Sequence, residues 1–309
     1  MSHRRNKKNI LPLLICFAVL AILIITVVGT KVENGPEDDP STGKNSIMVA
    51  EFLDVGQGDC SLFILPDNKT VLIDAANTND GGKIVDYLTS KGIKRIDYLI
   101  ATHPHADHIG GMAEVINKME IGRIFAPKLS REDIPTTKCY ENFLKAVKRK
   151  NLKIDSAVSG TVLFKGEGYK AECFAPNSGE YDSLNNYSVI TKISFGSTAF
   201  LTVGDAEILS ESEVLAKNFD LKSDVLKVGH HGSSTSSSER FLKAVNPQYA
   251  VISCGAQNSY GHPHAKTIKA LESLRGLKKY FRTDKDKTVI FKSDGHNISY
   301  TTKNIKVAG

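Results

Sequence analysis

A cluster of metal-binding side chains between Thr102 and Gly111, in the run THPHADHIGG, constrains the fold and chemistry of this chain most strongly. Residues 95–101 before it have the apolar pattern of a strand, and residues 110–119 after it begin a helical pattern. We therefore expect a loop at the carboxyl end of a strand, where layered α/β proteins usually bind ligands. Imidazole and carboxylate groups at this spacing suit one or two ions of zinc or a neighbouring metal. The candidate ligands are His103, His105, Asp107 and His108. The alternative is a solvated loop that is merely rich in histidine.

The first 46 residues divide into three segments. Residues 1–9 are basic, and residues 10–29 form an apolar run long enough for a single transmembrane helix. Residues 30–46 are acidic and rich in Pro, Gly and Ser, which predicts a flexible linker. Because positive charge stays in the cytoplasm, we expect a single-pass protein of the cell membrane with residues 47–309 outside the cytoplasm. A cleaved signal peptide, and hence a secreted protein, is the alternative, although the cleavage signal is weak.

The charge and cysteine content exclude few functions. The net charge is +6, but Arg4, Arg5, Lys7 and Lys8 precede the apolar run. Removing these four leaves 36 basic against 34 acidic residues, so the remaining charge of +2 gives no argument for a polyanionic partner. None of the five cysteines belongs to a Cys-x-x-Cys pair, which argues against a structural zinc knuckle and leaves disulfides open.

Two more predicted strands in the domain of residues 47–309 end in histidines. Residues 223–228 are followed by His230 and His231, and residues 250–255 by His262 and His264. A third strand, residues 198–203, ends at Asp205, which is a metal ligand or a helix cap. The three strand ends that precede His103, His230 and His262 thus carry seven of the nine histidines. This coincidence is the strongest indication of a metal site.

Other polar residues near strand ends are candidates for an accessory role. An aspartate at such a place can orient a ligand histidine by accepting the proton of its second ring nitrogen. Turn capping is the alternative for Asp54 and Asp59. The accessory candidates are Asp54, Asp59, Asp74, Asn185, Asn186 and Ser188.

The pattern His-x-His-x-Asp-His resembles the signature of the metallo-β-lactamase superfamily. The resemblance implies a four-layer αββα sandwich with two metals at one edge. His103 and His105 would bind the first metal, Asp107 and His108 the second, and Asp205 both. His230 aligns as the remaining ligand of the second metal, whereas His231 is left as a ligand, a proton carrier or a phosphate contact.

One expected ligand of the first metal is missing. Many members of the superfamily supply a third histidine between the positions of His108 and Asp205, where this chain has none. Asn185 or Asn186 would have to contribute an amide oxygen instead. A site with fewer imidazoles should hold zinc less tightly and move toward manganese, so we expect two divalent ions, Zn²⁺ or Mn²⁺, of unequal affinity.

The wider motif set resembles the extracellular hydrolase domain of the ComEC/Rec2 competence proteins over residues 47–301. It comprises DVGQGD at Asp54, VLKVGHHGS at Val225 and YGHPH at Tyr260, besides the signature. The resemblance implies a nuclease that degrades one strand of incoming DNA. This chain lacks the multi-span channel of those proteins, so we do not expect it to be the uptake pore.

The expected reaction is attack of a metal-bridged hydroxide on a phosphodiester. The candidate catalytic residues, three of which could assist the leaving oxygen, are Asp107, His231, His262 and His264. Contacts to single-stranded DNA would come from a basic run that could equally be a solvated surface: Arg275, Lys278, Lys279, Tyr280 and Arg282. The competing hypotheses are hydrolysis of a lactone, thioester or cell-wall phosphodiester, and a non-catalytic exported binding domain. No protein partner can be deduced.

Overall fold

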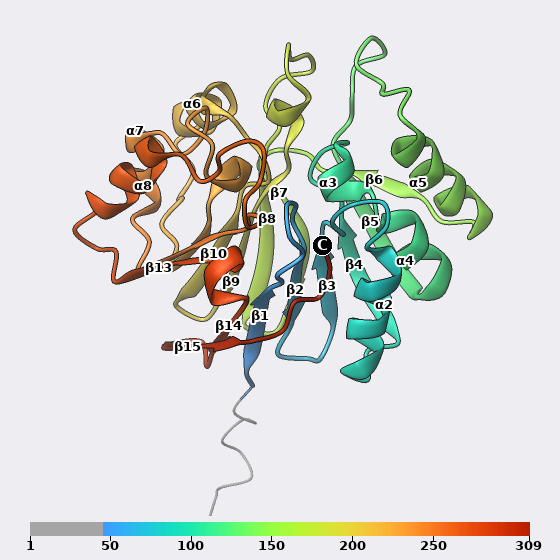
Figure 1. The fold of residues 1–309 in the computed structure, drawn as a ribbon, viewed down its shortest axis with the longest axis horizontal. Coiled ribbons are helices and arrows are strands. Elements are labelled where there is room, and N and C mark those ends of the chain that lie inside the picture. The colour runs from blue at the N-terminus through green and yellow to red at the C-terminus, as the bar shows by residue number, and fades with distance from the viewer. Residues whose placement is uncertain (1–45) are drawn as a thin grey trace, which may run out of the picture. The chain divides into compact units, whose positions relative to one another are not determined.

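The computed structural model of the chain describes residues 46–309 (Figure 1). The predicted membrane anchor, residues 10–29, and almost all of the predicted linker lie outside the described residues. Within residues 46–309, no helix combines the length and the apolar character needed to cross a bilayer.

The first sheet has eight strands in the order β15-β14-β1-β2-β3-β4-β5-β6. Its antiparallel half runs from β15 to β3, and β3 to β6 are parallel. The strands are β1 (Met48–Phe52), β2 (Ser61–Ile64), β3 (Thr70–Ile73), β4 (Arg95–Ile100), β5 (Glu120–Ala126), β6 (Ile154–Ser156), β14 (Thr288–Ser293) and β15 (Ile298–Lys303). The first strand of the domain thus pairs with one of its last two.

The second sheet has seven strands in the order β13-β12-β11-β10-β9-β8-β7. Strands β10 to β13 are parallel, and β7 to β10 are antiparallel. The strands are β7 (Thr161–Gly166), β8 (Tyr169–Ala175), β9 (Ile190–Phe195), β10 (Thr198–Thr202), β11 (Val225–Lys227), β12 (Tyr249–Ile252) and β13 (Lys279–Arg282).

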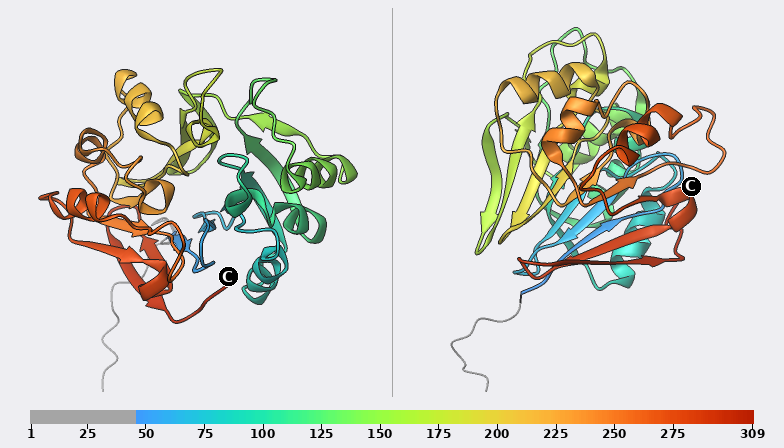
Figure 2. Two further views of the ribbon diagram at one scale, coloured as in Figure 1. Left: turned by 45° about the horizontal axis from the view of Figure 1, so that its top comes forward. Right: turned by 90° about the vertical axis from the view of Figure 1, so that its left-hand side faces the viewer.

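Helices cover the outer face of each sheet (Figures 1 and 2). Apolar side chains of α2, α4 and α5 share a buried cluster with the first sheet, and those of α7 and α8 share one with the second. The helices are α2 (Gly81–Ser90), α3 (Ala106–Ile109), α4 (Met112–Lys118), α5 (Lys138–Arg149), α6 (Ile208–Ala216), α7 (Glu239–Val245), α8 (Ala265–Glu272) and α9 (Thr283–Asp286), with 3₁₀ turns η1 (Leu184–Tyr187) and η2 (Gly229–Gly232). The expected mixed α/β sandwich of two sheets is confirmed.

The central strands of the sheets are buried on both faces, as their apolar pattern requires, whereas the edge strands β6, β7 and β15 are partly or largely exposed. In β3, Val71 and Ile73 face the second sheet, while Leu72 between them packs under the helices, because successive side chains of a strand point to opposite faces. Between the sheets, Phe200 of β10 packs edge-on against Phe63 and Phe291 of the first sheet. This aromatic contact joins the two sheets, and the loops at the carboxyl ends of β4, β10, β11 and β12 meet above it at one edge of the sandwich.

Candidate metal centre

The loop after β4 and the first turn of α3 carry the histidines of the signature. His103 and His108 are buried. Asp74, at the end of the neighbouring strand β3, accepts hydrogen bonds from the Thr102 backbone N–H at 2.9 Å and hydroxyl at 2.7 Å. The same carboxylate accepts a hydrogen bond from His108 Nδ1 at 2.7 Å. With Nδ1 engaged by Asp74, Nε2 is the nitrogen of His108 left to bind a metal, and it faces Asp205 Oδ1 at 3.2 Å.

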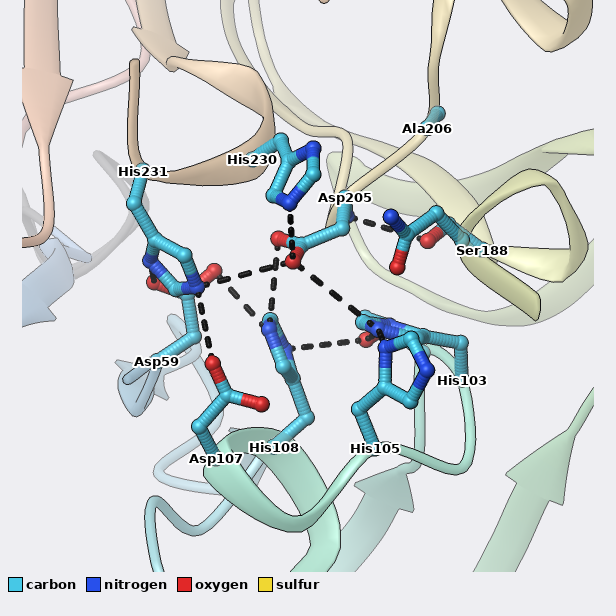
Figure 3. Close-up of polar contacts among 12 residues, drawn as sticks. Asp59, His103, His105, Asp107, His108, Ser188, Asp205, Ala206, His230 and His231 are labelled. Atoms are coloured by element: carbon cyan, nitrogen blue, oxygen red, sulfur yellow. Dashed lines mark hydrogen bonds and ion pairs between the residues drawn. The ribbon is translucent and has the colours of Figure 1, made fainter. Parts of the chain in front are cut away.

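Asp205 lies at the centre of the cluster, between β10 and α6, with 2 % of its surface exposed. Gly204 before it has a φ of +51°, and a Cβ there would lie 2.9 Å from the Thr102 side chain, so only glycine fits. The Ser188 hydroxyl accepts a hydrogen bond from the Asp205 backbone N–H at 3.0 Å. These contacts aim both carboxylate oxygens of Asp205 at the histidines (Figure 3).

One group of four side chains has the geometry of a metal site. Asp107, His108, Asp205 and His231 each offer a ligand atom, and these four atoms all lie within 4.8 Å of one another. His231 Nε2 lies 3.2 Å from Asp107 Oδ2 and 3.5 Å from Asp205 Oδ2. His231 Nδ1 donates a hydrogen bond to the Ser253 carbonyl at 3.0 Å, which leaves Nε2 free to bind an ion.

The structure therefore brings His231, where the sequence favoured His230, into the group of the second metal. Both residues have left-handed backbone conformations in η2, with φ of +48° and +53°, so consecutive side chains point in directions that a strand or helix pattern does not predict. His230 Nε2 lies 3.7 Å from Asp205 Oδ2, and its Nδ1 contacts the Thr235 hydroxyl at 3.1 Å. Figure 3 shows His231 and Asp107 on one side of Asp205, and His103 and His105 on the other.

The first two histidines of the signature, His103 and His105, converge as ligands of a first metal would. His103 Nε2 lies 3.0 Å from His105 Nδ1 and 3.9 Å from Asp205 Oδ2. The two asparagines differ in availability. Asn186 Oδ1 accepts a hydrogen bond from the Glu207 backbone N–H at 3.1 Å, whereas the buried Asn185 Oδ1 has no hydrogen-bond partner among residues 46–309. Asn185 and His230 are therefore the remaining donors on this side.

Unpaired polar atoms show that this donor set fits cations. In the described part of the chain, His108 Nε2, Asp205 Oδ1 and Asn185 Oδ1 are buried without a hydrogen bond, and the first two contact each other only as an ion pair at 3.2 Å. Leaving such atoms unpaired is costly, and a divalent ion would satisfy them. Imidazole, carboxylate and amide oxygen ligands suit zinc and manganese alike. The cluster is thus a candidate site for two metals.

The charges of the cluster favour the ionised carboxylates that metal binding requires. Burial alone would raise the pKa of Asp205, but His108 and His231 hold that pKa well below its usual range. Burial would lower the pKa of His108, yet Asp205 and Asp74 raise it well above the ordinary value. More carboxylates than cationic groups surround His108, so the electrostatic potential there is negative and attracts cations.

Lys227, the last residue of β11, is a site residue that sequence reasoning missed. Its side chain is buried, and Nζ lies 2.8 Å from Asp59 Oδ2. Asp59 Oδ1 in turn lies 3.7 Å from His231 Nδ1, so this ion pair packs directly behind the ligand. The sequence did contain a signal for such a buried lysine, because Lys227 interrupts the apolar run 225–228 just before the paired histidines.

Several predicted residues lie outside the cluster. Asp54 accepts a hydrogen bond from the Gly56 backbone N–H at 3.2 Å and lies 3.5 Å from Lys287 Nζ, so it caps a turn and orients no histidine. His264 Nδ1 accepts a hydrogen bond from the Ser234 backbone N–H and Nε2 donates one to the Tyr260 carbonyl, so both ring nitrogens are engaged within the loops and its catalytic role stays a prediction. Asp74 and Asp59, by contrast, do contact the histidines.

The predicted DNA-binding run is largely engaged within the fold. Lys278 bonds to Gln248, Tyr280 to Glu272, and Arg282 pairs with Asp284. Lys279 begins β13, at the end of the strand away from the metal centre, and its Nζ lies 4.6 Å from the Phe281 ring centroid. Lys278 and Lys279 therefore lie at the end of β13 away from the cluster, whereas Arg282 lies at the other end, opposite Ile252 of β12.

A cleft of 310 Å³ opens onto the candidate metals. The loop after β12 forms one wall with His262, whose pKa is lowered to about 4 by burial and by the neighbouring His231. In the described residues, His262 Nδ1 has no hydrogen-bond partner. The cleft is lined by Gln57, His105, Ala106, Asp107, Asn185, Asp205, His230, His231, Tyr260 and His262.

Known proteins resemble this chain in sequence and in fold. It is 32 % identical over 261 residues to ComE operon protein 3 of Bacillus subtilis, covering 78 % of this chain and 32 % of that protein. It is 29 % identical to competence protein ComA of Neisseria gonorrhoeae, covering 89 % and 37 %, and 30 % identical to recombination protein 2 of Haemophilus influenzae, covering 73 % and 26 %. The chain thus spans about a third of the length of these relatives, and the predicted resemblance to competence proteins is confirmed.

Solved structures share the fold at low sequence identity. CmlA, a diiron β-hydroxylase from Streptomyces venezuelae, has a TM-score of 0.53 at 15 % identity, covering 83 % of this chain and 54 % of its own. Igni18, a metallo hydrolase from Ignicoccus hospitalis, has a TM-score of 0.51 at 17 % identity, covering 79 % and 98 %. Residues 53–256 match the metallo-β-lactamase superfamily. With that match, the two-sheet sandwich and the Asp/His cluster at its edge, the chain belongs to the metallo-β-lactamase superfamily as a metal-dependent hydrolase related to competence proteins.

Proposed function

We propose that this hydrolase is a phosphodiesterase that cleaves DNA. The observation that carries the proposal is the cluster of Asp107, His108, Asp205 and His231, whose ligand atoms lie within 4.8 Å of one another at the bottom of an open cleft. The relatives are competence and recombination proteins, which favours DNA as the substrate class.

The residues of the cluster divide into two ligand sets. Asp107, His108, Asp205 and His231 would hold one ion, and His103, His105 and Asp205 the other, with Asn185 and His230 as its remaining donors. When bound, two divalent ions supply an acidified water and neutralise the charge of a phosphate. Asp205 belongs to both sets because each of its oxygens faces a different histidine, Oδ1 at 3.2 Å from His108 and Oδ2 at 3.9 Å from His103.

The surrounding residues hold the ligands in place. Asp74 fixes the proton of His108 on Nδ1, and the Ser253 carbonyl does the same for His231. Lys227 neutralises Asp59 behind His231, which prevents that carboxylate from drawing the imidazole away from the cleft. His262 also lines the cleft, so it is the candidate to contact the leaving oxygen.

We also propose that residues 10–29 anchor the hydrolase in the cell membrane with the domain outside the cytoplasm, because basic residues precede this apolar run. Protease added to intact cells should then remove the domain. Protection of the domain in intact cells would contradict the orientation, and release of a protein starting near Thr30 would contradict the anchor.

The test of the proposed activity uses the purified full chain. Single-stranded DNA, double-stranded DNA, bis(p-nitrophenyl) phosphate and a lactone are each incubated with Zn²⁺, Mn²⁺, Mg²⁺ or Ca²⁺. We expect metal-dependent cleavage of DNA that His108→Ala abolishes. His296→Ala, which removes an exposed histidine of the turn before β15, is the matched control and should leave the rate unchanged. Hydrolysis of the lactone alone, with DNA intact at every metal, would refute the proposal.

A further inference from the structure

Tyr260 is the most exposed of the large apolar or aromatic side chains in the described part of the chain, at 63 %. It lies in the loop between β12 and α8 and lines the cleft over the candidate metals. Its ring stacks on His262, with centroids 5.5 Å apart and planes 19° from parallel. An aromatic ring is thus presented to solvent at the wall of a cleft whose other residues are almost all polar.

The loop that carries Tyr260 is held on several sides. The Asn258 side chain donates to the carbonyls of Gly255 at 2.9 Å and His262 at 2.7 Å, and accepts from the His262 backbone N–H at 2.9 Å. The Gly255 backbone N–H donates to Gln57 Oε1 at 3.0 Å, which ties the loop to the turn after β1. The Tyr260 carbonyl accepts from His264 Nε2 at 3.1 Å. The ring is therefore placed in advance of any substrate.

This placement serves no evident purpose within the fold. The Tyr260 ring packs on no apolar cluster, and its hydroxyl makes no hydrogen bond in residues 46–309. A ring backed on one face by His262 leaves its other face for a flat partner. Stacking of bases on aromatic side chains is how proteins hold single strands without reading their sequence.

We propose that Tyr260 is a stacking platform for a nucleobase beside the scissile phosphate, and hence the residue that makes the cleft prefer nucleotide phosphodiesters. The inference rests on the proposed function and deepens it. A polar phosphodiester of the cell wall, which lacks bases, gains nothing from the platform. Tyr260 acts on binding and position of the substrate and does not enter the metal ligand set.

The experiment compares two substrates and three variants of the full chain. One substrate is a single-stranded oligodeoxynucleotide, and the other is an abasic oligomer of equal length that keeps every phosphodiester. For Tyr260→Ala we expect kcat/KM on the normal strand to fall about 10- to 100-fold, the range for loss of one stacked base, with no change on the abasic strand. Tyr260→Phe should behave as wild type. Tyr300→Ala, which truncates an exposed tyrosine on the edge strand β15, is the control.

Each outcome decides the inference. Equal losses for Tyr260→Ala on both strands would show a structural role, and a loss in Tyr260→Phe as large as in Tyr260→Ala would show that the hydroxyl acts. Either result overturns the platform. If the wild type cleaves both strands at the same rate, the stacking role of Tyr260 is refuted while the proposed phosphodiesterase activity is supported. If the wild type cleaves neither strand with any metal, the proposed function itself falls, and the inference with it.

Discussion

Replacing Asp74 by asparagine should weaken metal binding while the domain stays folded. The carboxylate of Asp74 accepts from His108 Nδ1 at 2.7 Å and from two donors of Thr102, at 2.9 and 2.7 Å. An amide keeps one acceptor oxygen, but it loses the charge that holds the His108 proton on Nδ1. Losing such a partner of a ligand histidine costs about 10- to 100-fold in metal affinity.

The assay measures the free energy of unfolding by denaturant, once with a chelator and once at a fixed excess of metal. The difference between the two measurements is the stabilisation by metal, because an ion that binds only the folded state adds to its stability. A 10- to 100-fold loss of affinity should shrink this difference by about 1.4 to 2.8 kcal/mol. Any cost of the substitution to the metal-free fold appears in both measurements and cancels.

Asp97→Asn is the matched control. Asp97 accepts from the Thr70 backbone N–H at 2.9 Å and pairs with Arg95 near the start of β4, at the opposite end of the strand from the metal centre. Its loss should lower stability equally with and without metal. An undiminished metal stabilisation in Asp74→Asn, or an equal decrease in Asp97→Asn, would refute the role given to Asp74.

Three further predictions follow from the geometry. Asp205→Ala should abolish hydrolysis in a steady-state assay while circular dichroism shows an intact fold, since both ligand sets lose a member; retained turnover at saturating metal would refute the shared role. Phe200→Ala, fully buried between the sheets, should lower the free energy of unfolding by about 3–5 kcal/mol in a denaturant titration, and a loss below 1 kcal/mol would contradict the packing. Burial and a hydrogen bond to Glu213 raise the pKa of Tyr181 to about 12. The folded state therefore keeps this proton while the unfolded state releases it above its ordinary pKa, so stability should fall as pH rises from about 10 to 12, less steeply in Tyr181→Phe. Identical pH slopes for the two proteins would contradict this.

The sequence was most informative where function depends on neighbouring residues. His103, His105, Asp107 and His108 lie within six residues, so a strand followed by a helical turn suffices to bring them together. Individual strands such as β3 and β10 were predictable because they are apolar-rich segments, whereas the two-sheet sandwich was expected only from the family resemblance. Family resemblance added the pairing of the sheets, which no local pattern contains.

Contacts between distant segments were harder to predict. The choice between His230 and His231 depends on two consecutive left-handed residues, a conformation that non-glycine side chains adopt rarely. The buried ion pair joins Lys227 of the second sheet with Asp59 in the turn between β1 and β2, and only the assembled sandwich brings them together. The contacts of His264 within the loops could not be predicted either, because motif membership does not tell which way a loop histidine points.

The pairing of β1 with β14 has a consequence for the order of events during folding. The Asp54 backbone N–H donates to the Thr288 hydroxyl, 234 residues away, and the Asp54 carbonyl accepts from Val307 and Ala308. The start of the turn that leads to Asp59, behind the ligand His231, therefore gains these contacts only when the last strands dock. Closing so long a loop is slow. We expect the chain to acquire its ions late, as one of the final steps of folding, so that a metal added to a refolding protein should stabilise the product without speeding the main phase.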